Sequence, residues 1–143
     1  MRLLFVDDEP ERIEVVRRTL EDVLEAEVVV AATVEEAVAE LHRASADLVV
    51  FDMFMPLGAW NKGALGARAR KYADRIEHLG GLVFVEELQR ISPQPKALLH
   101  TACNDYVLLK QMDEVVQARI PKPAPADVLV RFVLEALGLP VPS

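Results

Sequence analysis

Five short apolar runs alternate with longer amphipathic segments along this chain of 143 residues. The runs are too short for buried helices, but they suit strands that are covered on both faces. They lie at 3–6, 28–32, 48–51, 97–101 and 118–121. The segments after them carry apolar residues at helical spacing, including 11–25, 33–44, 82–91, 106–115 and 125–137. This alternation predicts an α/β fold of three layers, with a doubly wound parallel sheet between two helical layers.

Pro121 indicates the order of the strands. A proline inside a strand is tolerated mainly at the edge of a sheet. In the flavodoxin-like order 2-1-3-4-5 the fifth strand is an edge, and the central strands here have no proline before their ends. We therefore expect this five-stranded order in a single domain over 1–143. Thr33 and Glu36 also form a capping box, which marks the start of the second helix.

Composition excludes several classes of protein. The net charge of −7 argues against nonspecific nucleic-acid binding by this domain. The single cysteine, Cys103, excludes an internal disulfide and is compatible with the cytosol. No apolar run approaches the roughly 20 residues of a membrane span. We expect a cytoplasmic domain that binds neither membrane nor nucleic acid; a stand-alone protein and a fragment of a larger one would share this sequence.

Polar side chains follow four of the five predicted strands. Asp7 and Asp8 follow the first, Asp52 the third, and Lys122 the fifth, while Thr101 ends the fourth. The carboxyl ends of parallel strands meet at one edge of a sheet, where ligands collect. Because the first and third strands are neighbours in the expected order, the three carboxylates should converge there.

This set of side chains suits phosphoryl transfer. Three carboxylates without a counter-ion would repel one another, and a hard divalent cation such as Mg²⁺ relieves that repulsion. The hydroxyl of Thr101 and the ammonium of Lys122 suit a phosphoryl group. Asp52 is placed to attack phosphorus and form an acyl phosphate.

Four short motifs resemble those of the receiver domain of two-component response regulators, the CheY-like family. They are V-D-D-E-P at 6–10, D-M-F-M-P at 52–56, H-T-A at 100–102 and K-P at 122–123. Each motif is weak alone, but the four occur in order, at strand ends, over nearly the whole chain.

The resemblance implies a role for each matched residue. Asp52 would be the phosphoacceptor in a phosphorelay. Asp8 would bind Mg²⁺ directly, Asp7 mainly through water, and Asp52 and the main-chain carbonyl of Phe54 would complete the metal site.

On the other side of the site, Thr101 would hydrogen-bond the phosphoryl group and shift when it arrives, and Lys122 would pair with a phosphoryl oxygen. The Lys122–Pro123 bond would be cis, as is typical in the family. The phosphoryl donor would be a phosphohistidine of a histidine kinase or a histidine phosphotransfer domain, and output would run through protein–protein contact.

The chain departs from the family after the third strand. Asp52 and Thr101 are 49 positions apart, roughly twenty more than a loop, a helix and a strand need. The excess lies in 57–80, an insertion whose middle, 64–79, we expect to be helical. It carries a net charge of +3 from Lys62, Arg68, Arg70, Lys71 and Arg75 against Asp74 and Glu77. We expect a helical lid or a docking surface for one partner, such as a downstream protein; the alternative is a solvated, tolerated loop.

A second departure is Arg119, which stands three positions before Lys122, where the family usually has an aromatic residue that moves on activation. Output would then run through other contacts, or the domain would act as a relay.

Three alternatives remain open. The chain could be a receiver-like binding module that acts without phosphorylation. A haloacid-dehalogenase-like phosphatase fits poorly, because that class needs an aspartate two residues after the nucleophile, where Phe54 stands; Phe54 instead predicts a shielded site and slow self-dephosphorylation.

Trp60 is either a partner anchor or a residue that pins the insertion to the body. Cys103 either borders the site or is an inert small residue. The three histidines, His42, His78 and His100, have no metal-ligand spacing, and we assign them no role.

Overall fold

The computed structural model describes residues 1–60 and 65–141 and contains a five-stranded, all-parallel sheet. The strand order is β2-β1-β3-β4-β5, as the position of Pro121 predicts. The strands are β1 Arg2–Val6, β2 Glu27–Ala31, β3 Leu48–Phe51, β4 Lys96–Thr101 and β5 Ala118–Pro121. Pro121 therefore lies in an edge strand, where its missing N–H costs the sheet little.

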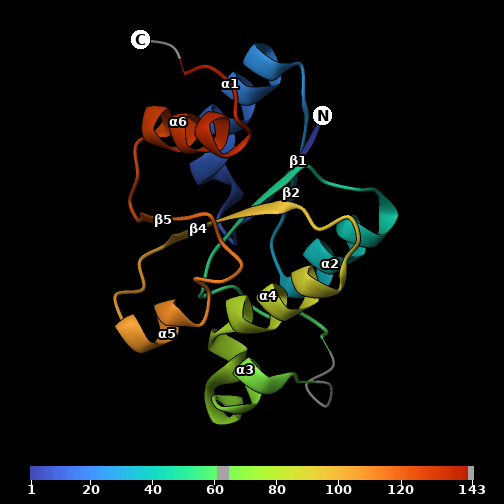
Figure 1. Cartoon of the computed structure of the whole chain (residues 1–143), viewed down its shortest axis with the longest axis vertical. Coiled ribbons are helices and arrows are strands. Elements are labelled where there is room, and N and C mark those ends of the chain that lie inside the picture. Colours follow the sequence, from blue (N-terminus) through green and yellow to red (C-terminus); the bar gives the residue numbers. More distant parts are fainter. Residues whose placement is uncertain (61–64, 142–143) are drawn as a thin grey trace.

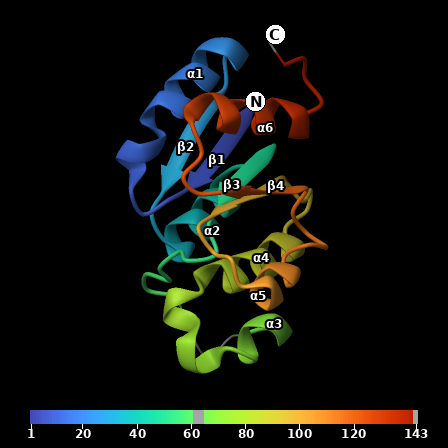
Figure 2. The ribbon, with the colours of Figure 1, turned by 90° about the vertical axis from the view of Figure 1, so that its left-hand side faces the viewer.

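Helices cover both faces of the sheet. Along the chain they are η1 Pro10–Ile13, α1 Glu14–Leu24, α2 Val34–Arg43, α3 Ala67–Arg70, η2 Ala73–His78, α4 Gly80–Arg90, α5 Tyr106–Lys110 and α6 Ala126–Ala136. Helices α1 and α6 lie on one face, and α2, α4 and α5 lie on the other (Figures 1 and 2). Among the described residues, no helix is long and apolar enough to cross a membrane.

The capping box is confirmed, whereas two helix predictions need correction. The Thr33 hydroxyl accepts from the N–H of Glu36, and the Glu36 carboxylate accepts from the N–H of Ala32. The helix expected over 106–115 ends at Lys110, and the chain continues in short turns to Val115. The helix expected over 64–79 is two short helices, α3 and η2, and its first residue, Ala64, lies outside the described residues.

Helix α4 is buried on nearly all sides in its first half, since every residue from 80 to 85 is buried. An ordinary surface helix buries only one stripe. The outer side of α4 is covered by residues 65–79, which we call the outer segment; α3 lies beyond α4 in both ribbon views (Figures 1 and 2). Ala69, Ile76 and Leu79 of this segment are themselves buried.

Polar contacts tie the outer segment to α4. The α3 N-cap is Gly66, which has no capping side chain, and the Glu86 carboxylate of α4 instead accepts from the N–H of Ala69 at 2.9 Å. Arg68 donates to Gln89 at 2.6 Å and lies 3.9 Å from the Glu114 carboxylate. The outer segment is therefore ordered against α4, although many of its residues are exposed, and a tolerated insertion remains the alternative to a functional one; Lys62 lies outside the described residues.

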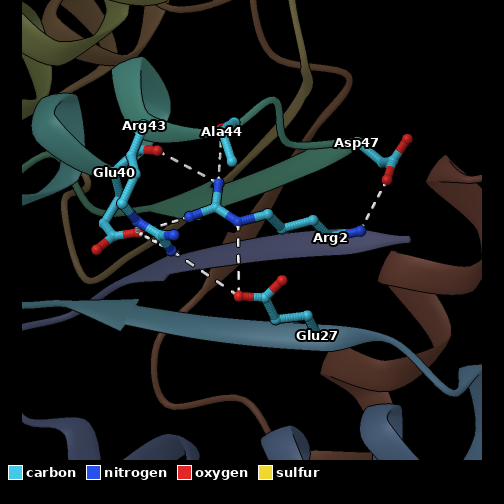
Figure 3. A network of polar contacts seen from close by, with 6 residues as sticks. All are labelled: Arg2, Glu27, Glu40, Arg43, Ala44 and Asp47. Carbon is cyan, nitrogen blue, oxygen red and sulfur yellow. Dashed lines mark hydrogen bonds and ion pairs between the residues drawn. The ribbon is translucent and has the colours of Figure 1, made fainter.

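Buried Arg2 joins three elements at the amino edge of the sheet (Figure 3). Its guanidinium donates to the Ala44 carbonyl at 2.7 Å, where α2 ends, and to the Glu40 carboxylate at 2.5 Å. Its main-chain N–H donates to Asp47 at 2.8 Å, just before β3. The Glu27 carboxylate of β2 lies 3.9 Å away. Arg2 thus supplies donors to the unpaired carbonyls at a helix C-terminus.

We predict that Arg2→Ala lowers the free energy of unfolding by about 2–3 kcal/mol, because it leaves the half-buried Ala44 carbonyl without this donor and removes the buried member of the two arginines that pair with Glu40. Arg12→Ala is the matched control, because Arg12 is 61% exposed and, among the described residues, forms an ion pair with Glu9 alone; it should cost under about 0.5 kcal/mol. Urea unfolding of both variants measures the difference. Equal losses would contradict this account of the network.

Candidate functional site

The alternation of side chains along the strands brings three polar residues into one row. Phe5, Val50 and Leu98 are neighbours in the register of β1, β3 and β4, and they belong to the core that faces α1 and α6. Since alternate residues share a face, Asp7, Asp52 and His100 follow two positions later on the same side. The carboxyl ends of the three strands therefore place these residues beside one another.

Lys122 reaches across this row from the end of β5. Its ammonium donates to Asp52 Oδ2 at 2.8 Å and to Asp7 Oδ2 at 3.2 Å. The three side chains are only 14%, 14% and 7% exposed, in the order Lys122, Asp52, Asp7. Burial alone would lower the pKa of Lys122, but the hydrogen bond and charge of Asp52, with the charge of Asp7, raise it above its ordinary value. Lys122 is therefore charged and bridges both carboxylates.

The loop after Asp52 is held between the N-termini of two helices. The carbonyls of Met53 and Met55 accept from the N–H groups of Gly81 and Gly80 at the start of α4, each at 3.0 Å. On the other side, the carbonyls of Pro56 and Leu57 accept from the first N–H groups of α2, at 2.9 and 3.2 Å. These contacts satisfy donors that a helix N-terminus otherwise leaves unpaired.

Two glycines make this close approach possible. A Cβ at Gly81 would lie 2.6 Å from Met53 Cα and 2.7 Å from the Asp52 carbonyl oxygen, and a Cβ at Gly80 would lie 2.2 Å from the Met55 carbonyl oxygen. Both obstacles are backbone atoms, which cannot move aside as a flexible side chain would. The Gly80–Gly81 pair thus lets α4 start against the Asp52 loop.

The same loop leaves one carbonyl free. Among residues 53–57, only the Phe54 carbonyl accepts no hydrogen bond from the described residues. The side chains alternate in burial, with Met53 and Met55 buried and Phe54 45% exposed. The predicted shielding of Asp52 by Phe54, and with it slow self-dephosphorylation, stays a prediction, and the Phe54 carbonyl, free among the described residues, is suited to the predicted role of metal ligand.

The predicted Mg²⁺ ligands meet only in part. Asp7 and Asp52 lie together under Lys122, whereas Asp8 is exposed and makes no ion pair with the described residues. Within residues 1–60 and 65–141, no group of three histidine, cysteine or acidic side chains is arranged to hold a metal. The donor set is nevertheless chemically suitable, because carboxylates and a free carbonyl are the ligands that Mg²⁺ prefers. The metal site stays a prediction.

Thr101 lies on the other side of the sheet from this row. It is 3% exposed, and its hydroxyl accepts from the N–H of Cys103 at 3.1 Å. Beside it, a pocket of about 240 Å³ is lined by Cys103 and Arg119, among others. Arg119 itself lies 3.5 Å from the Asp113 carboxylate, so a salt bridge occupies the position where the family has its aromatic residue.

The polar contacts of Arg68 and Ala69 in the outer segment go to α4 and to Glu114, and among the described residues no hydrogen bond or ion pair joins these two residues to Asp52 or Lys122. The lid prediction therefore finds no support in the described residues. Trp60 is partly buried and packs against the core, which favours a role in pinning the chain to the body. The Lys122–Pro123 bond is cis, as predicted.

His100 is the site residue that sequence reasoning missed. It is 9% exposed, and its Nε2 atom is buried and has no hydrogen-bond partner among residues 1–60 and 65–141. Burial, followed by the charge of Lys122, lowers the pKa of His100 to about 4, and Asp7 and Asp52 offset only part of this. The sequence did carry one signal for His100. Residues two positions apart on a strand face the same side of the sheet, so His100 follows Leu98 on β4 as Asp52 follows Val50 on β3.

We predict that His100 makes the fold sensitive to acid. Because the pKa of His100 falls from an ordinary value of 6.5 to about 4 on folding, the unfolded chain binds more protons between these values. Stability should therefore be lost as pH falls from 6.5 to 4, by up to about 3 kcal/mol, and this loss should be absent above pH 6.5.

Urea unfolding with a chelator present, compared between wild type and His100→Leu, isolates the effect. The variant should lose less stability over the same pH interval. His42→Gln, at an exposed position of α2, is the control and should follow the wild type. Parallel profiles for wild type and His100→Leu would show that His100 is not responsible.

Comparison with known proteins supports the fold. No family model matches the chain, and no curated protein matches its sequence. The non-phosphorylated receiver domain of HemR from Leptospira biflexa is 22% identical and superimposes with a TM-score of 0.73, over 99% of this chain and 98% of that one. A CheY-like response regulator receiver domain protein from Methanospirillum hungatei JF-1 is 21% identical, with a TM-score of 0.72 over 96% and 93% of the two chains.

The signal receiver domain of a putative LuxO repressor protein from Vibrio parahaemolyticus is 16% identical, with a TM-score of 0.71 over 96% of this chain and 89% of that one. The sheet order agrees with this likeness. The chain therefore has the fold of the CheY-like response regulator receiver domains.

Proposed function

We propose that this chain is a phosphoacceptor receiver domain of a two-component or phosphorelay system. The observation that carries the proposal is the Lys122 ammonium, which bridges Asp52 and Asp7 at the carboxyl edge of a 2-1-3-4-5 sheet. An aspartate on the open surface is stabilised by water and would need no ammonium beside it, whereas Asp52 is largely buried and is held by Lys122. The likeness in fold to solved receiver domains supports the same role.

In the proposed reaction, an Asp52 carboxylate oxygen attacks the phosphorus of a phosphohistidine on a histidine kinase or a phosphotransfer domain. The new bond joins that oxygen to phosphorus, the nitrogen–phosphorus bond breaks, and the imidazole of the partner leaves with its electron pair. The Lys122 ammonium would turn from Asp52 to a phosphoryl oxygen, where a charge-assisted bond stabilises the developing charge. The Thr101 side chain, which lies on the other side of the sheet before phosphorylation, would shift so that its hydroxyl donates to another phosphoryl oxygen.

Asp7, Asp8, Asp52 and the Phe54 carbonyl would hold Mg²⁺. When bound, Mg²⁺ would neutralise the carboxylates and the incoming phosphoryl group. The rigid loop at 53–57 would keep Asp52 in place for the attack, because its carbonyls are tied to α2 and α4.

Phosphorylation at Asp52 is testable with acetyl phosphate and Mg²⁺. Intact mass spectrometry should show the gain of one phosphoryl group in the wild type and none in Asp52→Asn, because the amide lacks the nucleophilic oxygen. Asp22→Asn, an exposed acid of α1, is the control and should still gain it. A chelator should abolish the gain.

One observation favours a second candidate, a binding module that acts without phosphorylation. In the described part of the chain, no three side chains form a metal-binding group, and Lys122 already neutralises part of the acidic row. The same mass measurement separates the two functions. A wild type that gains no phosphoryl group, although folded, would favour the binding module.

We further propose that the outer segment docks a protein partner with an acidic face. Arg70, Lys71 and Arg75 are exposed and form no ion pair among the described residues, although the whole chain has a net charge of −7. Arg75 lies over the Tyr72 ring, 5.5 Å from its centroid. We call these three cations the cationic surface and take the phosphodonor as the partner to test.

The double variant Arg70→Gln/Lys71→Gln should lower the rate of phosphotransfer from the cognate kinase by about fivefold at low salt, and by less at high salt, because complementary charge steers association. Arg18→Gln/Arg131→Gln removes equal charge from α1 and α6 on the other face and is the control. If the two double variants lowered the rate equally, the effect would come from the net charge of the chain and not from the cationic surface.

A further inference from the structure

A groove of about 500 Å³ lies between α1 and α6, at the end of the molecule away from the outer segment (Figures 1 and 2). Each helix contributes residues four positions apart, which share one side of a helix. The uncharged part of the lining is formed by Val15, Thr19, Ala126, Val130, Leu134 and Val141. Because the Thr19 hydroxyl already donates to the Val15 carbonyl at 2.8 Å, this part of the groove presents mainly apolar surface.

Large apolar side chains at this groove are exposed to water. Val15 is 64% exposed and Val141 is 36% exposed. Val23, about two turns further along α1, is 53% exposed. Three of the seven exposed large apolar side chains in the described part of the chain therefore belong to α1 or to the chain end beside the groove. Single exposed apolar residues need no explanation, but a group of them on one face marks a contact surface.

Two charged residues complete the groove, and neither has a partner. Asp127 and Arg131 are both exposed, and they form no ion pair among residues 1–60 and 65–141. By contrast, Arg17 and Arg18 of the neighbouring α1 both pair with Glu14. Asp127 and Arg131 lie one turn apart on the same side of α6. The groove thus carries one negative and one positive charge that are unpaired, and it has no net charge.

This charge pattern indicates the kind of partner. A strongly acidic or strongly basic partner would attract one of the two residues and repel the other. A second copy of the chain satisfies both, because a two-fold axis that passes α6 between positions 127 and 131 places Asp127 of one protomer opposite Arg131 of its partner, and the reverse. The apolar linings of the two grooves then face each other and leave water.

We propose that the α1–α6 groove is the contact surface of a symmetric dimer of this chain. The dimer uses no residue of the proposed phosphorylation site and forms without a phosphodonor. The net charge of −7 on each protomer opposes the association, so the dissociation constant is on the order of 100 µM. At the roughly 1 µM of a phosphotransfer assay the chain is therefore monomeric, and Arg131→Gln there reports on net charge alone.

Sedimentation velocity of the full chain tests the surface, without phosphodonor and from about 10 µM to about 1 mM. The wild type should pass from monomer to dimer. Val15→Lys should raise the dissociation constant at least about tenfold, because it places an ammonium in the apolar contact. Val107→Lys is the matched control, at a position on α5 that is 61% exposed, and it should leave the dissociation constant unchanged.

Two outcomes of this measurement would overturn the proposal. One is a wild type that stays monomeric up to the highest concentration. The other is a dimer that is lost in Val107→Lys and kept in Val15→Lys, which would place the contact on α5.

A charge exchange tests the two-fold symmetry. Arg131→Asp sets aspartates opposite aspartates, and Asp127→Arg sets arginines opposite arginines, so each variant alone should stay monomeric. An equimolar mixture of the two should dimerise like the wild type, since the aspartates of one variant then face the arginines of the other. Circular dichroism verifies that both variants fold. A mixture that stays monomeric, or either variant dimerising alone as the wild type does, would refute the proposed pairing.

Discussion

The structure depends on a loop that is held from both sides. The carbonyls of residues 53, 55, 56 and 57 accept the first N–H groups of α4 and α2, so two helix N-termini fix the backbone that follows Asp52. The glycine pair at 80–81 lets α4 approach to this distance. The packing of α2 and α4 and the position of Asp52 follow from this arrangement, and so does the Phe54 carbonyl, which accepts no hydrogen bond from the residues that the structure describes. A phosphoacceptor needs such a backbone, because in-line attack tolerates little displacement.

The two edges of the sheet use buried charge differently. At the amino edge, Arg2 is surrounded by acceptors from β2, α2 and the start of β3, and its role is to join these elements (Figure 3). At the carboxyl edge, Lys122 is shared between Asp7 and Asp52. Asp8 nearby has no ion pair within the described residues, so acidic charge there is only partly neutralised. This difference separates a structural network from a candidate reactive site.

Much of the fold could be predicted from the sequence because its signals are local. The short apolar runs and Pro121 predicted the sheet order, and the capping box at Thr33 predicted the start of α2. The path of the outer segment could not be predicted, because it depends on Glu86 capping α3 across 17 positions. His100 was missed for a related reason: its importance comes from register with Asp52 on the neighbouring strand, which no spacing along the chain reveals.

The most direct test of this account is the ¹H–¹⁵N spectrum of the chain with Mg²⁺ and the phosphomimetic beryllofluoride. If the held loop presents Asp52 as a phosphoacceptor, the peaks of residues 52–57, Thr101 and Lys122 should shift only when both reagents are present, and those of Asp52→Asn should not shift. The first turn of α4 should move little, because it is clamped to the loop. Unchanged peaks at Asp52, Thr101 and Lys122 in the wild type, or the same shifts in Asp52→Asn, would contradict the account.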